Sequence, residues 1–297
     1  MSTPRVWFIT GCSSGLGLDM TRAVLDKGDI AVATLRRPEV LADLKAQYPA
    51  DRLLILKVDV SVHSDIIAAF QKTKEVFGRI DVVVSNAGYV VLGEVEGTPD
   101  DAARALFEVN FWGATHVLQE AVRFLREENE PGKGGRIIQI TSGTGLFGFP
   151  SCGFYSASKH ARQAMEGLTE TLAGELDPAW NIKVTLIPLG AFRTNAMTTS
   201  IVQVPPLPAY TKSDLQSAKN RKAVLAGGTD NQDPSFQVKG DTYKAALALY
   251  RLSELPSPPL RLMLGKESAV GAKAKAASLL EDAEKYASWS EGLERDE

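Results

Sequence analysis

The sequence has few of the residues that build metal centres and disulfide frameworks. Only two of its 297 residues are cysteine and only three are histidine. Cys12 and Cys152 stand far apart, which excludes a disulfide framework and a cysteine-based zinc site. The three histidines show no metal-ligand spacing either (His63, His116 and His160). We therefore expect a reduced protein with no metal site.

Long hydrophobic runs and an excess of one charge are also missing. No stretch reaches the roughly 20 apolar residues of a membrane-spanning helix, and residues 1–5 lead directly into an expected strand without a signal peptide. The net charge of −3 gives no electrostatic reason to expect nucleic acid or an anionic membrane as a partner. These absences favour a cytoplasmic protein that binds neither.

What the chain does contain is an alternation of apolar runs and helical patterns. The runs are rich in Val, Ile and Leu, as is typical of strands buried on both faces, and occupy residues 5–10, 30–35, 52–58, 81–85, 136–141 and 182–187. Helical patterns separate them at 38–48, 62–77, 101–127 and 154–176. We predict one α/β domain over residues 1–297, a Rossmann-like doubly wound parallel sheet of about seven strands with helices on both faces.

The regular pattern breaks after Gly190. Residues 195–240 are rich in Thr, Ser, Pro, Gly and Asn, with a helical pattern near 212–226. They follow the strands and are placed to cover their carboxyl ends, so we expect a substrate lid, the alternative being a surface insertion without a role. A helix near 240–254, a last strand near 260–264 and a C-terminal helical extension over about 268–291 complete the chain. One side of that extension carries Ala269, Ala272, Ala276, Leu280, Ala283 and Ala287.

A glycine-rich turn follows the first expected strand and opens a helix. It reads T-G-x-x-x-G-x-G, with Thr10, Gly11, Gly15 and Gly17. Glycines at such a turn let the backbone approach a pyrophosphate, whose charge then lies at the helix N-terminus. The turn predicts a dinucleotide site, although a tight turn without a ligand is the alternative.

The end of the second expected strand indicates which dinucleotide is bound. An acidic residue about 20 positions after the glycines would contact the ribose 2′-hydroxyl of NAD, whereas arginine accommodates a 2′-phosphate. Arg36 and Arg37 stand there, and no acidic residue precedes Glu39. Two guanidiniums suit a phosphate, so we predict NADP; a solvated basic pair at a strand end is the alternative.

Two further turns carry polar candidates. Asp59 follows the third strand and is expected near the adenine, unless it caps the next helix or a turn. Asn86, Ala87 and Gly88 follow the fourth strand, where a small turn lets a cofactor lie against the backbone. Asn86 could instead cap that turn.

Tyr155 and Lys159 are four residues apart, which places them one turn apart on the same face of a helix. A fixed ammonium favours phenolate and lowers the pKa of a tyrosine from its usual value of about 10. Such a tyrosine exchanges a proton near neutral pH. A core tyrosine beside a surface lysine is the alternative.

Together these motifs resemble the short-chain dehydrogenase/reductase family. The resemblance covers about residues 5–265 and rests on the glycine turn, the Ser-Asn-Ala-Gly at 85–88, Asn110, Ser142, Tyr155 and Lys159. The region after Thr194 and the proline-rich residues 255–260 resemble the branch around 17β-hydroxysteroid dehydrogenases and fungal ketoreductases.

The resemblance implies a catalytic role for four side chains. Tyr155 would protonate a carbonyl oxygen while NADPH delivers hydride, and Lys159 would lower the pKa of that phenol and bind the nicotinamide ribose. Ser142 would orient the carbonyl, unless it only caps a strand. Asn110 would anchor a water that links Lys159 to solvent, unless it only bonds backbone.

The resemblance also implies the cofactor contacts, with Thr194 at the nicotinamide carboxamide. Leu189 stands where the family usually has proline, which puts the rigidity of that loop in question. The full set of cofactor-binding candidates is Gly11, Ser13, Ser14, Gly15, Leu16, Gly17, Arg36, Arg37, Asp59, Val60, Asn86, Ala87, Gly88, Tyr155, Lys159, Gly190, Phe192 and Thr194.

The leading interpretation is an NADPH-dependent carbonyl reductase of an apolar ketone or aldehyde. Its expected cavity wall includes Leu146, Phe147, Phe149 and Phe192, and Cys152 either lines it or packs beneath it. Alternatives are an alcohol or hydroxysteroid dehydrogenase that runs oxidatively and a non-catalytic NADP sensor; a dehydratase or epimerase is disfavoured because the second lobe of such family members is absent.

The helices expected at 101–127 and 154–176 are apolar on more than one side, through Leu106, Val109, Val117, Leu118, Leu168 and Leu172. The resemblance implies that such a pair of helices meets its symmetry mate. We therefore expect a homodimer or homotetramer.

Overall fold

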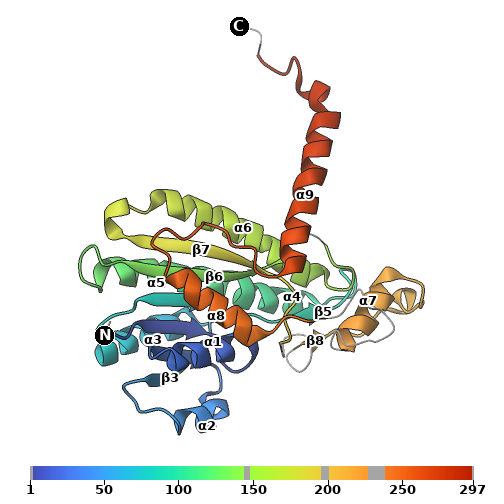
Figure 1. Cartoon of the computed structure of the whole chain (residues 1–297). Helices are drawn as coiled ribbons and strands as arrows, with labels where there is room; N and C mark the ends of the chain where they lie inside the picture. The colour runs from blue at the N-terminus through green and yellow to red at the C-terminus, as the bar shows by residue number, and fades with distance from the viewer. Residues whose placement is uncertain (1–2, 144–147, 195–200, 227–237, 296–297) are drawn as a thin grey trace.

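A six-stranded parallel sheet forms the centre of the molecule (Figure 1). The computed structural model describes residues 3–143, 148–194, 201–226 and 238–295. The strands lie in the order β3-β2-β1-β4-β6-β7. Their bounds are β1 Val6–Thr10, β2 Ile30–Leu35, β3 Leu53–Lys57, β4 Val82–Ser85, β6 Gly135–Ser142 and β7 Ile182–Leu189. The chain runs outward from β1 to β3 and resumes at β4 on the other side of β1, which confirms the doubly wound arrangement.

The seventh strand expected near 260–264 is present as a set of bridges beside β7. Leu186 N donates to Leu260 O over 2.8 Å, and Leu262 N donates to Leu186 O over 2.9 Å. Gly190 N then donates to Leu264 O over 2.7 Å. The pairing begins only at residue 260 because Pro258 and Pro259 have no N–H to donate.

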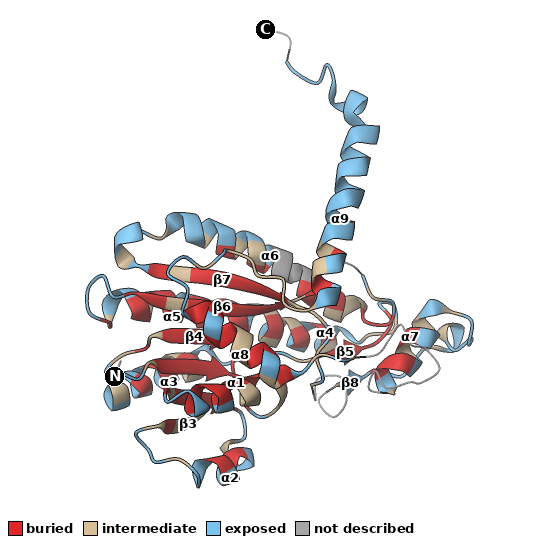
Figure 2. Ribbon diagram, viewed as in Figure 1, coloured by how far each residue is buried: buried red, intermediate tan, exposed pale blue. Residues whose placement is uncertain are grey.

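Helices cover both faces of the sheet, and the side chains of β1 show why (Figure 2). Trp7 and Ile9 lie in one core with Met20 of α1 (Gly15–Asp26) and with α8 (Thr242–Ser253). Phe8 points to the other face and joins a second core. That core is covered by α3 (His63–Phe77), α5 (Ala114–Glu127) and α6 (Gly153–Glu175). Strands buried on both sides account for the near-continuous apolar runs.

The helix expected over 101–127 is interrupted in its middle. It consists of α4 (Asp100–Phe107), a π-helical turn η2 (Glu108–Gly113) and α5. π-turns within helices often mark functional sites. This one holds Asn110, whose side chain is fully buried.

The apolar residues singled out for subunit contacts are used inside the chain. Leu106, Val117 and Leu118 are buried, with exposed fractions of 0%, 1% and 0%. Val109, Leu168 and Leu172 pack against the second core. These apolar residues therefore take part in the packing of the chain itself. Oligomerisation through the same helices stays a prediction.

The last third of the chain adds elements around the carboxyl edge of the sheet. A small parallel pair joins β5 (Val91–Leu92) to β8 (Val202–Gln203), and α7 (Gln216–Leu225) follows. Strands of two residues carry too little periodicity to be seen in a sequence, and neither was expected. At the other edge, beyond β2, lie the short helices η1 (Pro38–Leu41) and α2 (Ala42–Lys45).

The C-terminal helix α9 (Lys266–Lys285) stands away from the rest of the molecule (Figure 1). Within the described residues no helix has the length and apolar character needed to cross a membrane.

Candidate active site

A large cavity opens along the carboxyl ends of the strands. Its volume is about 1180 Å³. Seventeen positions expected at the cofactor contribute to its lining: Gly11, Ser13, Ser14, Gly15, Leu16, Arg36, Arg37, Asp59, Val60, Asn86, Ala87, Gly88, Tyr155, Lys159, Gly190, Phe192 and Thr194. Ser142 lines it as well. Gly17 and Asn110 are the two candidates that lie behind the wall rather than in it. The fold thus brings together residues from six separate turns.

The glycine turn is shaped for close approach. Gly11 and Gly15 have φ values of +74° and +54°, a region that favours glycine. A Cβ atom at Gly11 would lie 2.9 Å from the Cα atom of Ala87. At Gly17 a Cβ atom would lie 2.3 Å from the carbonyl oxygen of Gly11, so this glycine serves the packing of α1 against the turn. The turn leaves a cradle at a helix N-terminus that suits an anion.

Asn86 ties two of these turns together. Its Nδ2 donates to Thr10 O over 2.9 Å, and its backbone N donates to Thr10 Oγ1 over 2.9 Å. Ala87 N donates to the same hydroxyl over 3.0 Å. The side chain of Asn86 therefore has the turn-holding role that was the alternative to cofactor contact.

Arg36 and Arg37 lie at the rim of the cavity, and both are exposed. Among the ion pairs of the described residues, none involves either guanidinium. Asp59 lies nearby, but its Oδ1 accepts hydrogen bonds from Ser61 N over 3.0 Å and from Ser61 Oγ over 2.7 Å. Asp59 thus stabilises a turn, as the alternative held. The role of the two arginines at a phosphate stays a prediction.

Tyr155 and Lys159 lie in the first turns of α6, at the centre of the cavity wall. The Nζ atom of Lys159 lies 5.3 Å from the centroid of the Tyr155 ring. Lys159 is only 8% exposed, so its charge is held in place and poorly screened. Ser142, the last residue of β6, lines the same cavity. The arrangement places the phenol of Tyr155 beside a fixed cation. It also places the hydroxyl of Ser142, at the end of β6, in the wall of the same cavity.

Asn110 bonds the backbone of Tyr89 and the side chain of Ser158, and its expected role with a water stays a prediction. Its Nδ2 donates to Tyr89 O over 3.0 Å and to Ser158 Oγ over 3.1 Å. Its Oδ1 accepts from Tyr89 N over 3.0 Å. A Cβ atom at Gly88 would lie 3.0 Å from that Oδ1 and 3.6 Å from Lys159 Nζ. The absence of a side chain at Gly88 therefore leaves room for both Asn110 Oδ1 and Lys159 Nζ beside this turn.

Leu189 is the last residue of β7, and it lines the same cavity. It pairs with Ser142 in the strand register, and on its other side it bridges Leu264. A proline at this position would have no N–H for the ladder. Leucine thus extends the sheet beside Ser142 and does not loosen it. Thr194 lies across from the glycine turn, because a Cβ atom at Gly15 would lie 3.1 Å from its Cβ atom.

The first turn of α9 contributes two residues that the sequence did not indicate. Glu267 and Ser268 line the cavity, and Ser268 Oγ donates to Pro188 O over 2.6 Å. A carboxylate beside Gly190 narrows this end, where a Cβ atom at Gly190 would lie 3.0 Å from Glu267 Oε2. No motif marks these positions, since only the return of the chain to β7 brings them here.

The remaining wall is mainly apolar. Phe149 and Phe192 line it as expected, with Val90, which precedes β5, and Val202 of β8. Leu146 and Phe147, also expected in the wall, lie outside the described residues. Cys152 lines the cavity too, but burial raises the pKa of its thiol to about 12, so it stays protonated at neutral pH and serves in packing.

Comparisons with known proteins show which family the chain resembles and which fold it shares. A family model described as short chain dehydrogenase matches residues 5–204. The chain is similar to an uncharacterized oxidoreductase of Schizosaccharomyces pombe, with 34% identity over 269 residues that cover 90% of this chain and 84% of the relative. Oxidoreductase calM of Penicillium decumbens is 34% identical over 290 residues, which cover 96% and 91% of the two chains. The crystal structure of a short-chain dehydrogenase from Streptomyces avermitilis gives a TM-score of 0.83 at 30% identity, over 99% of this chain and 100% of that one.

Proposed function

The chain belongs to the short-chain dehydrogenase family, and on that premise we propose that it is an NADPH-dependent carbonyl reductase with Tyr155 as its general acid. It is an oxidoreductase that acts between CH–OH and C=O groups. The observation that carries the proposal is the buried Lys159, whose Nζ atom lies 5.3 Å from the ring centroid of Tyr155 on the cavity wall. A non-catalytic NADP sensor has no need of such a pair.

Each catalytic group acts through a position that the fold gives it. The phenol of Tyr155 donates its proton to the carbonyl oxygen of the substrate, and the ammonium of Lys159 stabilises the phenolate that remains. Ser142 donates a hydrogen bond to the same oxygen and orients it. Asn110 holds the turn at Tyr89 and anchors a water that restores the proton through Lys159.

The nicotinamide cofactor is a property of the family, and the residues of this chain fit it. When bound, it supplies the hydride. The cradle at Gly11 and Gly15 suits its pyrophosphate, Lys159 would hold its ribose and Thr194 its carboxamide. Arg36 and Arg37, exposed at the rim, would hold the 2′-phosphate of NADP.

An apolar ketone or aldehyde is the proposed substrate class. Phe149, Phe192, Val90 and Val202 supply the wall that supports it. An alcohol dehydrogenase that runs oxidatively is the second candidate, since the same groups catalyse both directions. Membership of the branch around hydroxysteroid dehydrogenases and fungal ketoreductases, and a lid over residues 195–240, belong to the same proposal.

The experiment is NADPH oxidation followed at 340 nm against a panel of apolar ketones and aldehydes, with the matching alcohols and NADP in parallel. Turnover of at least one carbonyl that Tyr155→Phe abolishes supports the proposal. Binding of NADPH without turnover of any member, in both directions, would favour the sensor instead.

A further inference from the structure

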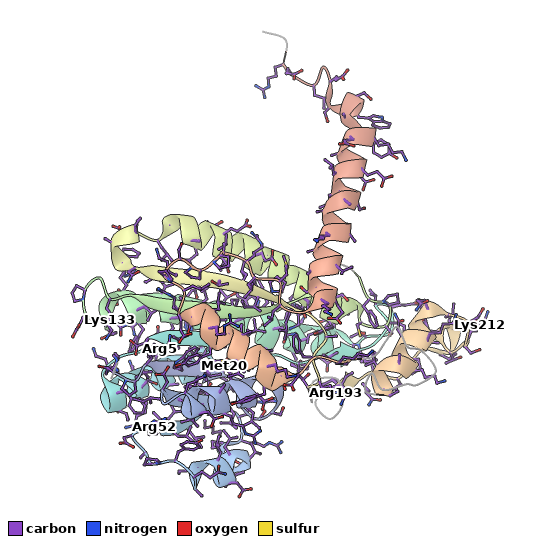
Figure 3. The ribbon with its side chains drawn as sticks, viewed as in Figure 1. Arg5, Met20, Arg52, Lys133, Arg193 and Lys212 are labelled. Atoms are coloured by element: carbon purple, nitrogen blue, oxygen red, sulfur yellow. The ribbon has the colours of Figure 1, made fainter. Side chains whose placement is uncertain are left out.

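The helix α9 leaves large apolar side chains without cover. Leu279 and Leu280 are 56% and 60% exposed, and Trp289 beyond the helix end is 80% exposed. Only Ser268 and Gly271 of α9 are buried, at its first turns. Figure 3 shows the side chains of the later turns pointing into open space on every side of the helix. Most of the stability of a helix in a protein comes from packing of its apolar face, so the uncovered apolar face of α9 indicates a partner.

Five of the apolar positions of α9, with Tyr286 directly after it, follow a coiled-coil spacing. Alternating steps of three and four residues connect Ala269, Ala272, Ala276, Leu279, Ala283 and Tyr286. This seam is symmetric about its midpoint between residues 277 and 278. An antiparallel copy of the same helix would place Ala276 opposite Leu279 and Ala269 opposite Tyr286. Small side chains would then face large ones at these two layers, which is how two helices approach closely and fill the space between them.

Charge along the helix selects the same orientation. Lys273 and Lys275 lie in the first half of α9, whereas Glu281, Asp282 and Glu284 lie in the second. Two parallel copies would place like charges side by side. Two antiparallel copies place Lys275 beside Asp282 of the other helix, and they do so twice because the arrangement is two-fold symmetric. Within the described residues no ion pair uses any of these five side chains.

We propose that α9 pairs with α9 of a second copy of this chain as an antiparallel coiled coil. A surface that is complementary to itself in shape and in charge points to an identical partner. An antiparallel pair would place the two domains at opposite ends of the coiled coil, separated by about 25 Å along the helix axis. The first turn of α9 carries Ser268, which lines the cavity and bonds Pro188, so the pairing also steadies that wall.

The test is the mass of the full chain in solution, measured by sedimentation equilibrium at several concentrations. We expect a dimer, and we expect Leu279→Asp to convert it to a monomer. Lys275→Asp and Asp282→Lys should each raise the dimer dissociation constant about tenfold, since each replaces two attractions by two repulsions. An equimolar mixture of these two variants should restore dimerisation, because each supplies the charge that the other lacks.

The controls distinguish pairing through α9 from dimerisation through another surface and from loss of folding. Lys285→Asp makes the same change of charge as Lys275→Asp but at a position outside the seam, so it should leave the mass of the dimer unchanged. Far-ultraviolet circular dichroism confirms that each variant keeps a folded domain. A monomeric parent chain, a dimer that all α9 variants preserve, or a monomer that binds phosphatidylserine vesicles through α9 would each overturn the proposal.

Discussion

Arg221 of α7 forms an ion pair with Glu94, which follows β5, and the Nη2–Oε2 distance is 2.7 Å. Their side chains are 12% and 5% exposed. Arg221 Nη1 also donates to Val204 O over 2.8 Å, and its neighbour Asn220 donates to Pro150 O over 3.1 Å. These contacts fasten α7, in the middle of the expected lid, to Glu94 and Pro150 outside the lid and to Val204 within it. Residues 195–200 and 227–237, on either side, lie outside the described residues.

Breaking this ion pair from one side should release α7. Arg221→Met leaves the Glu94 carboxylate buried without a counter-charge, and removing one partner of a buried pair costs about 3–5 kcal/mol. We expect a lower Tm and faster tryptic cleavage at Lys212 and Lys219, which NADPH with a substrate analogue should slow. Lys212 lies at the outer end of this segment (Figure 3).

The double variant Glu94→Gln/Arg221→Met should recover part of the lost stability, because no charge is left unpaired. Arg104→Ala is the matched control: its ion pair with Asp100 is fully exposed to solvent, and such pairs contribute little to stability. Cleavage at the same rate in the parent chain and in Arg221→Met, with and without ligands, would refute both the anchoring role and the lid.

Cofactor choice should follow the two arginines at the cavity rim. We expect the parent chain to prefer NADPH over NADH, because Arg36 and Arg37 meet the 2′-phosphate. Arg36→Asp with Arg37→Ala should weaken NADPH binding at least about tenfold and narrow or reverse that preference. The measurement is kcat/KM for both cofactors, and Arg22→Asp, on the exposed face of α1, controls for net charge. Equal use of NADH by the parent chain would contradict the assignment.

Catalysis should separate the roles of the phenol and the ammonium. Tyr155→Phe removes only the proton donor, so turnover should fall by about 100-fold or more while NADPH binding stays close to that of the parent. Lys159→Ala should reduce both, because its charge also contacts the cofactor. Fluorescence titration gives the binding constants, and Tyr48→Phe, outside the cavity, serves as control. A Tyr155→Phe enzyme with most of its rate would mean that another residue is the acid.

A stacked pair of histidines should make the stability pH-dependent. The rings of His63 and His116 lie 4.2 Å apart at 12°, and burial, then the neighbouring His63, lowers the pKa of His116. Glu108 opposes this shift. The unfolded chain therefore binds a proton more readily, so this contribution to stability is present above the unfolded pKa of about 6.5 and is lost as the pH falls through the folded value.

The measurement is the urea midpoint between pH 7.5 and pH 5. His116→Phe should remove most of the pH dependence of the midpoint. His63→Gln should weaken this dependence, because the substitution leaves His116 buried but removes the neighbouring like charge. Parallel profiles for the parent and His116→Phe would show that other groups carry the dependence.

Local sequence patterns determined the elements of this fold. The run at 30–35 becomes β2 with the same bounds, and the helix expected over 62–77 becomes α3 from His63 to Phe77. A strand of this kind can be predicted without knowing which strands lie beside it, because a strand buried on both faces of a sheet is apolar at nearly every position. The glycine turn, the arginine pair and the Tyr155–Lys159 pair are also local, since each lies within one turn of the chain.

Only the tertiary structure decided what these groups contact. Asn110 and Gly17 are recognisable in the sequence, yet they lie behind the cavity wall, where they bond backbone and pack a helix. Glu267 and Ser268 line the cavity without any motif, because the return of the chain beside β7 brings them there. Leu106 and Leu118 looked available to a partner and are buried in the chain's own core, whereas α9 projects outward. The periodicity of a helix shows that a face must be covered, but which surface covers it depends on contacts between residues distant in sequence.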